Sequence, residues 1–179
     1  MALLEILTYP NPILLQKAQP VEDIDDAVRE LLDNMAETMY DAPGVGLAAP
    51  QVGISLRAIV VDASPRVEGE HLIKLVNPVI TFAEGNTECE EGCLSVPGFS
   101  ESVTRAEKIV VEGYDGHGKP VKIETDTFLA TVLQHEIDHL DGVLFIDHLG
   151  RLKRDLIRRK LRKDAKRSQK KREKQQYAI

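Results

Sequence analysis

Apolar residues recur every three or four positions in three parts of the chain, which predicts three helices. The first predicted helix follows a break at Pro10 and Pro12 and is capped by Asp23 or Asp25. It ends at the glycine-containing segment 42–46, which interrupts the helical pattern. Its apolar positions are Ile24, Val28, Leu31, Leu32, Met35 and Met39.

The second predicted helix covers residues 127–140 and is apolar on more than one side, with Gly142 as a stop just beyond it. We expect such a helix to be buried over most of its circumference. The third begins near Leu149-Gly150 and has a single apolar face, which disappears after residue 161. That face consists of Leu149, Leu152, Leu156, Ile157 and Leu161.

Shorter apolar runs between the helices predict strands. We expect strands over residues 56–61 and 72–82, the second broken at Asn77-Pro78, with a loop over 64–69. Two further strands, over 103–113 and 121–127, are joined by a turn at residues 115–118. Neither a repeat nor a linker divides the first 150 residues. We therefore expect one domain of residues 1–148, extended by a C-terminal basic helix and tail of residues 149–179.

The charged residues are divided unevenly along the chain. The last 29 residues carry 14 lysines and arginines against three acidic residues, whereas the first 150 carry nine against 26. The main body is therefore near −17 and the tail near +11 in formal charge. This asymmetry indicates a basic arm that binds a polyanion.

Composition excludes several classes of protein. An apolar fraction of 42% and a charged fraction of 29% over 179 residues are typical of a globular domain and exclude a wholly disordered chain. No stretch approaches 18 uncharged apolar residues, and the first residues lack the basic start of a secretory signal. Two cysteines without such a signal indicate reduced thiols. We therefore expect a cytoplasmic protein without a membrane partner, in which a cysteine serves chemistry or a metal.

The segment His-Glu-Ile-Asp-His at residues 135–139 carries the main chemical signal. Positions i and i+4 of a helix share one face, so His135 and His139 can converge on one ion. Glu136 can then take a proton from water at an open coordination position. The alternative is a surface His-Glu-x-x-His. It is disfavoured because polar groups in so apolar a helix need partners.

A catalytic metal site needs a third protein ligand and an open position. The zinc-peptidase pattern would place another histidine at position 145, where this chain has Phe145. Downstream carboxylates are few, so the remaining soft ligand is Cys93, between a flexible glycine and an extended run. Cys89 as a further ligand would give a closed Cys2His2 site, which is a structural arrangement.

Three motifs together resemble those of the peptide deformylases. They occur in the family's order and match at nearly every position: Gly-Val-Gly-Leu-Ala-Ala-Pro-Gln at 44–51, Glu-Gly-Cys-Leu-Ser at 91–95 and Gln-His-Glu-Ile-Asp-His-Leu at 134–140. The length fits the bacterial type with a C-terminal helix. The resemblance implies an α+β fold in which antiparallel sheets surround a central helix that carries both histidines.

The resemblance also implies an activity and its residues. Cys93, His135 and His139 would bind the metal, and Glu136 would be the general base and acid. Gln51 and the backbone amide of Leu94 would face the carbonyl oxygen of the substrate. The reaction would be hydrolysis of the N-formyl group from the N-terminal methionine of nascent peptides, through hydroxide on the metal, with release of formate. Fe2+ would be the working ion, and two imidazoles with a thiolate also suit Zn2+, Ni2+ or Co2+.

The same resemblance implies a substrate pocket beside the metal. The backbone of Val45 and Gly46 would meet the peptide, and Leu94, Phe128 and Val132 would line a pocket for the methionine side chain. Val132 and His135 do lie one turn apart on the predicted helix. Plain core packing is the alternative for Phe128. The family often carries a basic residue soon after Pro97, whereas residues 98–101 of this chain have none.

The remaining polar residues have structural assignments. Asp138 faces away from the ion if the two histidines face it, and Arg105 is its best candidate partner. The remaining histidines, at 71, 117 and 148, have no evident partners and are expected on the surface or in turns.

The basic tail has two interpretations. In the family that these motifs resemble, the C-terminal helix contacts the ribosome near the tunnel exit, and a charge near +11 suits ribosomal RNA. A solvated charge run is the alternative. For the whole protein, a metallopeptidase is disfavoured because Cys93 replaces the third histidine or glutamate. The other alternative is a basic-armed RNA-binding protein with a structural zinc site.

Overall fold

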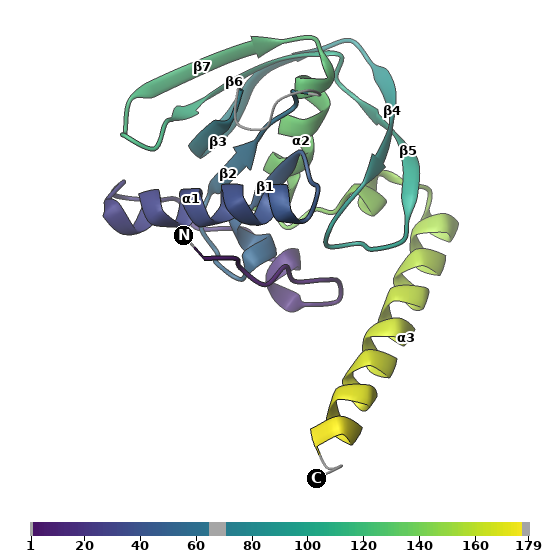
Figure 1. Cartoon of the computed structure of the whole chain (residues 1–179). Helices are drawn as coiled ribbons and strands as arrows, with labels where there is room; N and C mark the ends of the chain where they lie inside the picture. The colour runs from purple at the N-terminus through teal and green to yellow at the C-terminus, as the bar shows by residue number, and fades with distance from the viewer. Residues whose placement is uncertain (1, 65–70, 177–179) are drawn as a thin grey trace.

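The computed structural model describes residues 2–64 and 71–176 (Figure 1). The chain contains three α-helices, α1 (Asp26–Asp41), α2 (Phe128–Leu140) and α3 (Arg151–Gln176). Three short 3-10 helices are η1 (Pro12–Leu15), η2 (Ala49–Val52) and η3 (Phe145–His148). The strands are β1 (Gly46–Ala48), β2 (Ala58–Val61), β3 (Ile73–Glu84), β4 (Thr87–Gly92), β5 (Ser100–Arg105), β6 (Lys108–Tyr114) and β7 (Pro120–Thr125).

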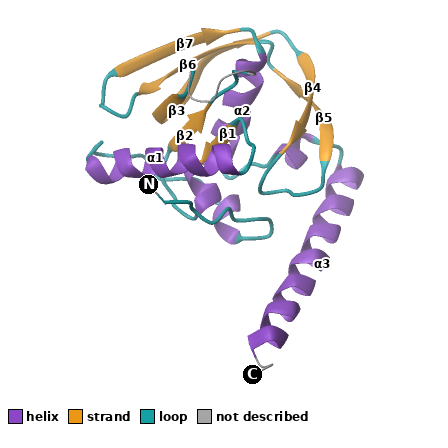
Figure 2. Ribbon diagram, in the orientation of Figure 1, coloured by secondary structure: helices purple, strands orange, loops and turns teal. Residues whose placement is uncertain are grey.

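The strands form two antiparallel sheets, so the α+β fold expected from the sequence is confirmed (Figure 2). The larger sheet has the order β1-β2-β3-β6-β7, and β4 and β5 form a separate two-stranded sheet. Alternate residues of β2 point to opposite faces of the larger sheet. Ile59 and Val61 pack with α2, whereas Ala58 and Val60 pack with α1. The central part of this sheet is therefore buried on both faces.

Helix α2 forms where the sequence predicts it, because both of its ends carry clear signals. The Thr127 hydroxyl accepts a hydrogen bond from the Leu129 amide at the N-terminus. Gly142 follows the last turn with φ of 72°, a conformation that favours glycine. At the C-terminus, the Leu140 carbonyl accepts a hydrogen bond from the Ala18 amide at 2.8 Å. Most of the helix is buried, as its apolar pattern predicts.

Two strand predictions need correction. The single strand expected over residues 103–113 is two strands: β5 ends at Arg105, β6 begins at Lys108, and they belong to different sheets. The break expected at Asn77-Pro78 is a bulge within one long strand, β3, where Asn77 has φ of 52°. Residues 65–69 of the predicted loop lie outside the described residues.

Helix α3 extends away from the body of the molecule (Figure 1). Only part of its predicted apolar face is buried. Ile157 and Leu161 are 4% and 5% exposed, whereas Leu152 and Leu156 are 78% and 53% exposed. The prediction was wrong for these two leucines because the helix meets the body along a narrower stripe. Within the described part of the chain, no helix is both long and apolar enough to span a membrane.

Candidate metal centre and active site

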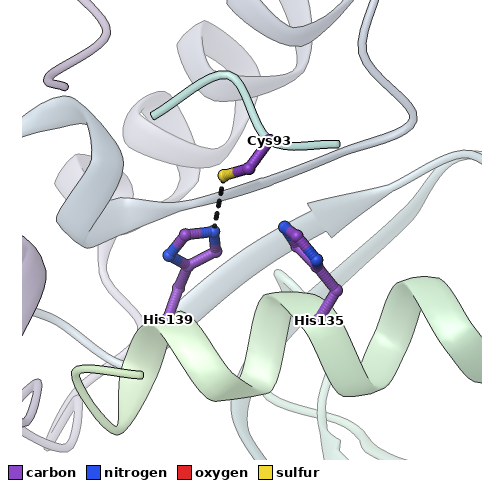
Figure 3. Close-up of side chains that lie close together, drawn as sticks. All are labelled: Cys93, His135 and His139. Carbon is purple, nitrogen blue, oxygen red and sulfur yellow. Dashed lines mark hydrogen bonds between the residues drawn. The ribbon is translucent and has the colours of Figure 1, made fainter. Parts of the chain in front are cut away.

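Three potential metal ligands meet beside helix α2 (Figure 3). His135 and His139 project from successive turns of the helix, as the i, i+4 spacing predicts. Cys93 comes directly after β4, and its Sγ lies 3.2 Å from Nε2 of His139. One donor atom from each of the three residues lies within 4.8 Å of the other two. The structure thus brings together the three residues that the sequence predicts as ligands.

This arrangement fits a divalent transition-metal ion. Ligand atoms about 2.0 to 2.4 Å from a shared ion lie three to four Å from one another, close to the separations seen here. Burial lowers the pKa of His139 well below its usual value, so this imidazole is neutral and its nitrogen can ligate. Its Nδ1 is buried without a hydrogen-bond partner among the described residues. One thiolate and two imidazoles form a donor set suited to zinc or iron.

Cys89 does not belong to this group of donors. Its Sγ lies 3.8 Å from the carbonyl oxygen of Glu90, and the described potential ligands that lie close enough to share an ion are Cys93, His135 and His139. The closed Cys2His2 alternative therefore has no support among the described residues, and a set of three protein ligands would leave a fourth position open.

Glu91 orients His135 through the Nδ1 atom of the imidazole. Its Oε2 lies 2.8 Å from Nδ1 of His135, and Arg105 donates two hydrogen bonds to the same carboxylate, at 2.7 and 2.9 Å. Burial disfavours the charged carboxylate, but the hydrogen bonds from Arg105 and His135 prevail and lower the pKa of Glu91 to about 2. An ionised Glu91 only accepts, so Nδ1 of His135 carries a proton. Burial disfavours the charged imidazole, but the hydrogen bonds with Cys93 and Glu91 prevail and raise the pKa of His135 well above its usual value, so a metal ion bound at Nε2 would displace a second proton.

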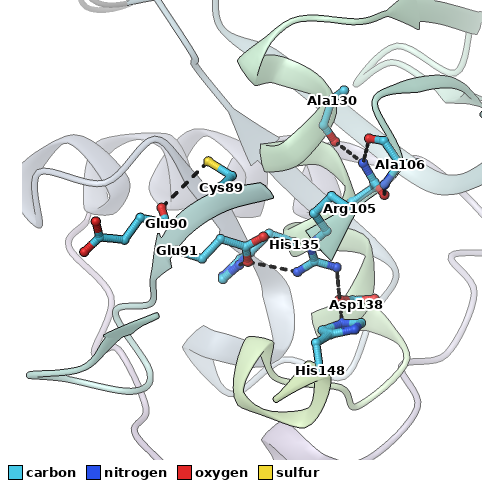
Figure 4. Close-up of polar contacts among 10 residues, drawn as sticks. Cys89, Glu90, Glu91, Arg105, Ala106, Ala130, His135, Asp138 and His148 are labelled. Carbon is cyan, nitrogen blue, oxygen red and sulfur yellow. Dashed lines mark hydrogen bonds and ion pairs between the residues drawn. The ribbon is translucent and has the colours of Figure 1, made fainter. Parts of the chain in front are cut away.

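Asp138 and His148 complete a polar network behind Arg105 (Figure 4). Arg105 Nη1 donates to Asp138 Oδ2 at 2.5 Å, which confirms the partner predicted for Asp138. His148 Nε2 lies 2.7 Å from the same oxygen. The expectation that His148 has no partner was therefore wrong, because η3 brings it back to the end of α2.

Glu136 is buried beside the three potential ligands. Its Oε2 has no hydrogen-bond partner among the described residues. Burial raises the pKa of this carboxyl to about 7, against the opposing charge of His135. The carboxyl packs over Gly46 of β1, where an added Cβ would lie 2.8 Å from Cγ and Cδ of Glu136. A carboxyl with such a pKa can accept and donate a proton near neutral pH.

Gln51 lies on η2 and lines the same pocket as Cys93 and Glu136. Its Oε1 accepts a hydrogen bond from the Ala48 amide at 2.8 Å, which fixes the orientation of the side-chain amide. Its Nε2 donates to Ser95 Oγ at 3.1 Å and lies 3.6 Å from Cys93 Sγ. A hydrogen-bond donor is thus held next to the sulfur atom of Cys93.

A pocket of about 460 Å³ opens onto these groups. Glu136, Gln51 and two of the potential ligands, Cys93 and His135, contribute to its walls. Phe128 at its mouth is 51% exposed, so plain core packing does not describe this side chain. The five residues predicted to contact substrate all line the pocket: Val45, Gly46, Leu94, Phe128 and Val132.

Sequence reasoning missed two members of the site. Glu91 belongs to the motif at residues 91–95, in which the chemical argument considered only Cys93. A signal for Glu91 was available, because it is an acidic residue at a buried position of β4, where more and less exposed residues alternate. His148 stands between an aspartate and a leucine in a segment without clear periodicity. The sequence offered no signal for its contact with Asp138.

Comparisons with known proteins agree with this architecture. The family model for polypeptide deformylase matches residues 3–155. A peptide deformylase of Thermodesulfovibrio yellowstonii is 52% identical over 162 residues, which cover 90% of this chain and 98% of the relative. The crystal structure of a peptide deformylase from Legionella pneumophila superposes with a TM-score of 0.86 at 48% identity, covering 93% of this chain and 98% of that one. A peptide deformylase from Ehrlichia chaffeensis in complex with actinonin gives 0.85 at 38% identity, with coverage of 92% and 98%.

Proposed function

We propose that this chain, which belongs to the polypeptide deformylase family, hydrolyses the N-formyl group from the N-terminal methionine of nascent polypeptides and releases formate. The observation that carries the proposal is the group of Cys93, His135 and His139 beside the buried carboxyl of Glu136 in one pocket. A thiolate, two imidazoles and a proton carrier are what metal-assisted amide hydrolysis requires.

The metal would be held by Cys93, His135 and His139. When bound, a divalent ion lowers the pKa of water from 15.7 to about 7 and polarises a carbonyl group. The thiolate of Cys93 offsets part of the positive charge. Glu91 keeps the proton of His135 on Nδ1, so that Nε2 faces the site.

Glu136 would move the proton during the reaction. Its carboxylate takes a proton from the attacking water and then passes it to the amine nitrogen that leaves as the formyl C–N bond breaks. The free Oε2 and the raised pKa suit both steps. The carboxyl is not among the potential ligands, so its role is proton transfer.

Two donors would stabilise the negative oxygen that develops on the formyl carbon. The side-chain amide of Gln51 and the backbone amide of Leu94 would face this oxygen from the Cys93 side of the pocket. One such donor contributes on the order of 3 kcal/mol to the transition state in comparable enzymes. Ser95 and Ala48 hold the Gln51 amide, so it needs little reorganisation.

The methionine of the substrate would enter the pocket next to α2. Leu94, Phe128 and Val132 would contact its side chain, and the backbone of Val45 and Gly46 would bind the peptide. Val132 is buried and lies one turn before His135, which places an apolar wall next to the reacting group.

We propose Fe2+ as the working ion, with Zn2+, Ni2+ or Co2+ able to replace it. The test is metal analysis of protein purified without oxygen, together with formate release from a formyl-Met peptide. We expect about one iron per chain and release that stops when a chelator removes the ion. Zinc without iron would overturn the choice of ion, and a metal-loaded protein that releases no formate would overturn the proposed function.

The basic segment of α3 would bind the ribosome near the tunnel exit, where formylated chains emerge in the cytoplasm. The described part of this segment has five exposed cations that provide charge for the phosphate backbone of RNA: Arg162, Lys163, Lys166, Arg167 and Lys170. Arg158 and Arg162 both lie near the ring of Tyr9, with their guanidinium carbons 6.0 and 5.8 Å from its centre. The contact holds Arg162 in place for the proposed RNA-binding segment, whereas Arg158 is also paired with Asp147.

A further inference from the structure

We infer that Arg105, supported by His148, is a positioning residue that sets the geometry of the metal site. This inference rests on the proposed function, because it takes Cys93, His135 and His139 as the ligands of one ion. Arg105 itself is a cation with no acceptor atom, so it does not ligate the ion. Its influence would pass through the groups that it holds.

The contacts of Arg105 form a closed ring that begins and ends on α2 (Figure 4). Asp138 of α2 binds Arg105 of β5, Arg105 binds Glu91 of β4, and Glu91 binds His135 of α2. Each contact is between 2.5 and 2.9 Å. The ring therefore connects one face of the helix to both strands of the β4–β5 sheet.

This connection determines where the thiolate lies relative to the imidazoles. Cys93 directly follows β4, and β4 pairs only with β5 in a sheet separate from the larger one, as far as the described residues show. The histidines belong to α2, which packs against the larger sheet. The ligand set is thus divided between two parts of the fold. Arg105 joins these parts by charged hydrogen bonds beside the site.

The guanidinium group of arginine suits the bridging of Glu91 and Asp138 better than the ammonium group of lysine does. Nε and Nη2 donate to the two oxygens of Glu91, while Nη1 donates to Asp138. Arg105 and Glu91 are each 5% exposed, so these bonds are shielded from water. Lysine would keep the charge but present a single nitrogen, which cannot make this fork.

His148 supports the ring from the outside. Asp138 Oδ2 only accepts, so His148 presents Nε2–H to it, and Arg105 Nη1 donates to the same oxygen. The 3.2 Å between Nη1 and Nε2 then results from two donors that share one acceptor. His148 thereby holds Asp138 in the orientation that Arg105 needs. Its side chain is about one-third exposed, so it can be replaced without opening the core.

The main test compares Arg105→Lys with Arg57→Lys as a matched control. Arg57 also binds an acidic residue at the end of α2, Asp141 at 2.8 Å, but lies outside the ring. Each protein is loaded with Zn2+ or Co2+, and affinity is measured by competition with a chelator. We expect Arg105→Lys to lose tenfold to about a hundredfold in affinity and to shift the thiolate-to-cobalt absorption band. Arg57→Lys should change neither.

A second pair of variants keeps the inference testable if Arg105→Lys does not fold. His148→Phe removes the donor to Asp138, whereas His148→Gln retains an N–H at a similar reach. We expect a few-fold loss of metal affinity for His148→Phe and recovery with His148→Gln, at unchanged secondary structure. This rescue separates positioning from a general loss of stability.

The outcomes distinguish this inference from the proposed function. Wild-type affinity and an unshifted cobalt band in folded Arg105→Lys, or equal behaviour of the two His148 variants, would overturn the positioning role alone. A wild-type protein that binds no ion at these three residues would overturn both. A protein that binds the ion but releases no formate would overturn the proposed reaction and leave the positioning role supported by the affinity measurements.

Discussion

Helices α2 and α3 place their charged residues in opposite environments. The polar side chains of α2 are mostly buried, and Asp138 and His135 each have a partner in the surrounding strands or loops. Helix α3 is twice as long, at 26 residues against 13, and most of its described side chains are exposed. The charged side chains of α2 therefore lie mainly inside the protein, whereas those of α3 lie mainly in solvent.

The difference shows how each helix is stabilised and what it can bind. Burial of charge costs free energy unless partners compensate, so α2 depends on the tertiary structure around it. Beyond Leu161, α3 has little to bury, and it consists mainly of Lys, Arg, Gln and Glu, which favour the helix intrinsically. A buried helix suits a small ion and a single amide bond, whereas an exposed basic helix suits an extended polyanion.

The largest effect is expected at Glu136 on α2. Replacement by glutamine keeps the size of the side chain but removes its ability to carry a proton. We expect formate release to fall by about a thousandfold or more, within the range of general acid–base catalysis, with the metal content unchanged. Formate release and metal analysis on the same sample provide the measurement. Loss of the metal would show that Glu136 is a ligand and that the proposed mechanism is wrong.

A smaller effect is expected at Gly46, which packs under the same carboxyl. An alanine Cβ would lie 2.8 Å from Cγ and Cδ of Glu136, so the side chain must move. We expect Gly46→Ala to lower turnover by tenfold to about a hundredfold, since small displacements of a catalytic group are costly. Gly150→Ala is the control, because an added Cβ there meets nothing within 4 Å. Equal turnover of the two variants would show that the position of Glu136 is not critical.

The sequence predicts those features that local signals determine. Helix α2 has a threonine cap, a glycine stop and an apolar pattern, and the structure agrees to within a residue. The i, i+4 spacing places His135 and His139 on one face, so their proximity also follows from local geometry. No local geometry places Cys93 beside these histidines. Its position was predicted from the motif at residues 91–95 and from the lack of another suitable ligand downstream.

Features that depend on distant partners were not predictable in the same way. The alternating pattern continues from β5 into β6, and nothing local indicates that the chain changes sheets after Arg105. Leu152 and Leu156 share a helical face with Ile157 in the sequence. In the structure, Ile157 and Leu161 are buried in the apolar cluster that contains Tyr9 and Val96, whereas Leu152 and Leu156 stay exposed. The contact between His148 and Asp138 arises when η3 folds back on α2.

Deletion of residues 162–179 is expected to leave catalysis unchanged, which makes it the smallest of the expected effects. The described pocket is built from residues 43–136, and Leu161 is the last buried residue of α3 among those whose side chains the structure describes. Turnover of a short formyl-Met peptide should therefore remain unchanged. A large loss of turnover would show that this segment supports the active site.

The same deletion should weaken binding to ribosomes by about tenfold at low salt, because cations on the segment release counterions from RNA. The difference between the full and shortened chains should shrink as salt is raised. A full-length variant with Lys163, Lys166 and Lys170 changed to glutamine keeps the helix and removes three charges, so it should lie between the two. If the shortened chain binds as tightly, with the same dependence on salt, the exposed charge of α3 serves solubility and the proposed ribosome contact is wrong.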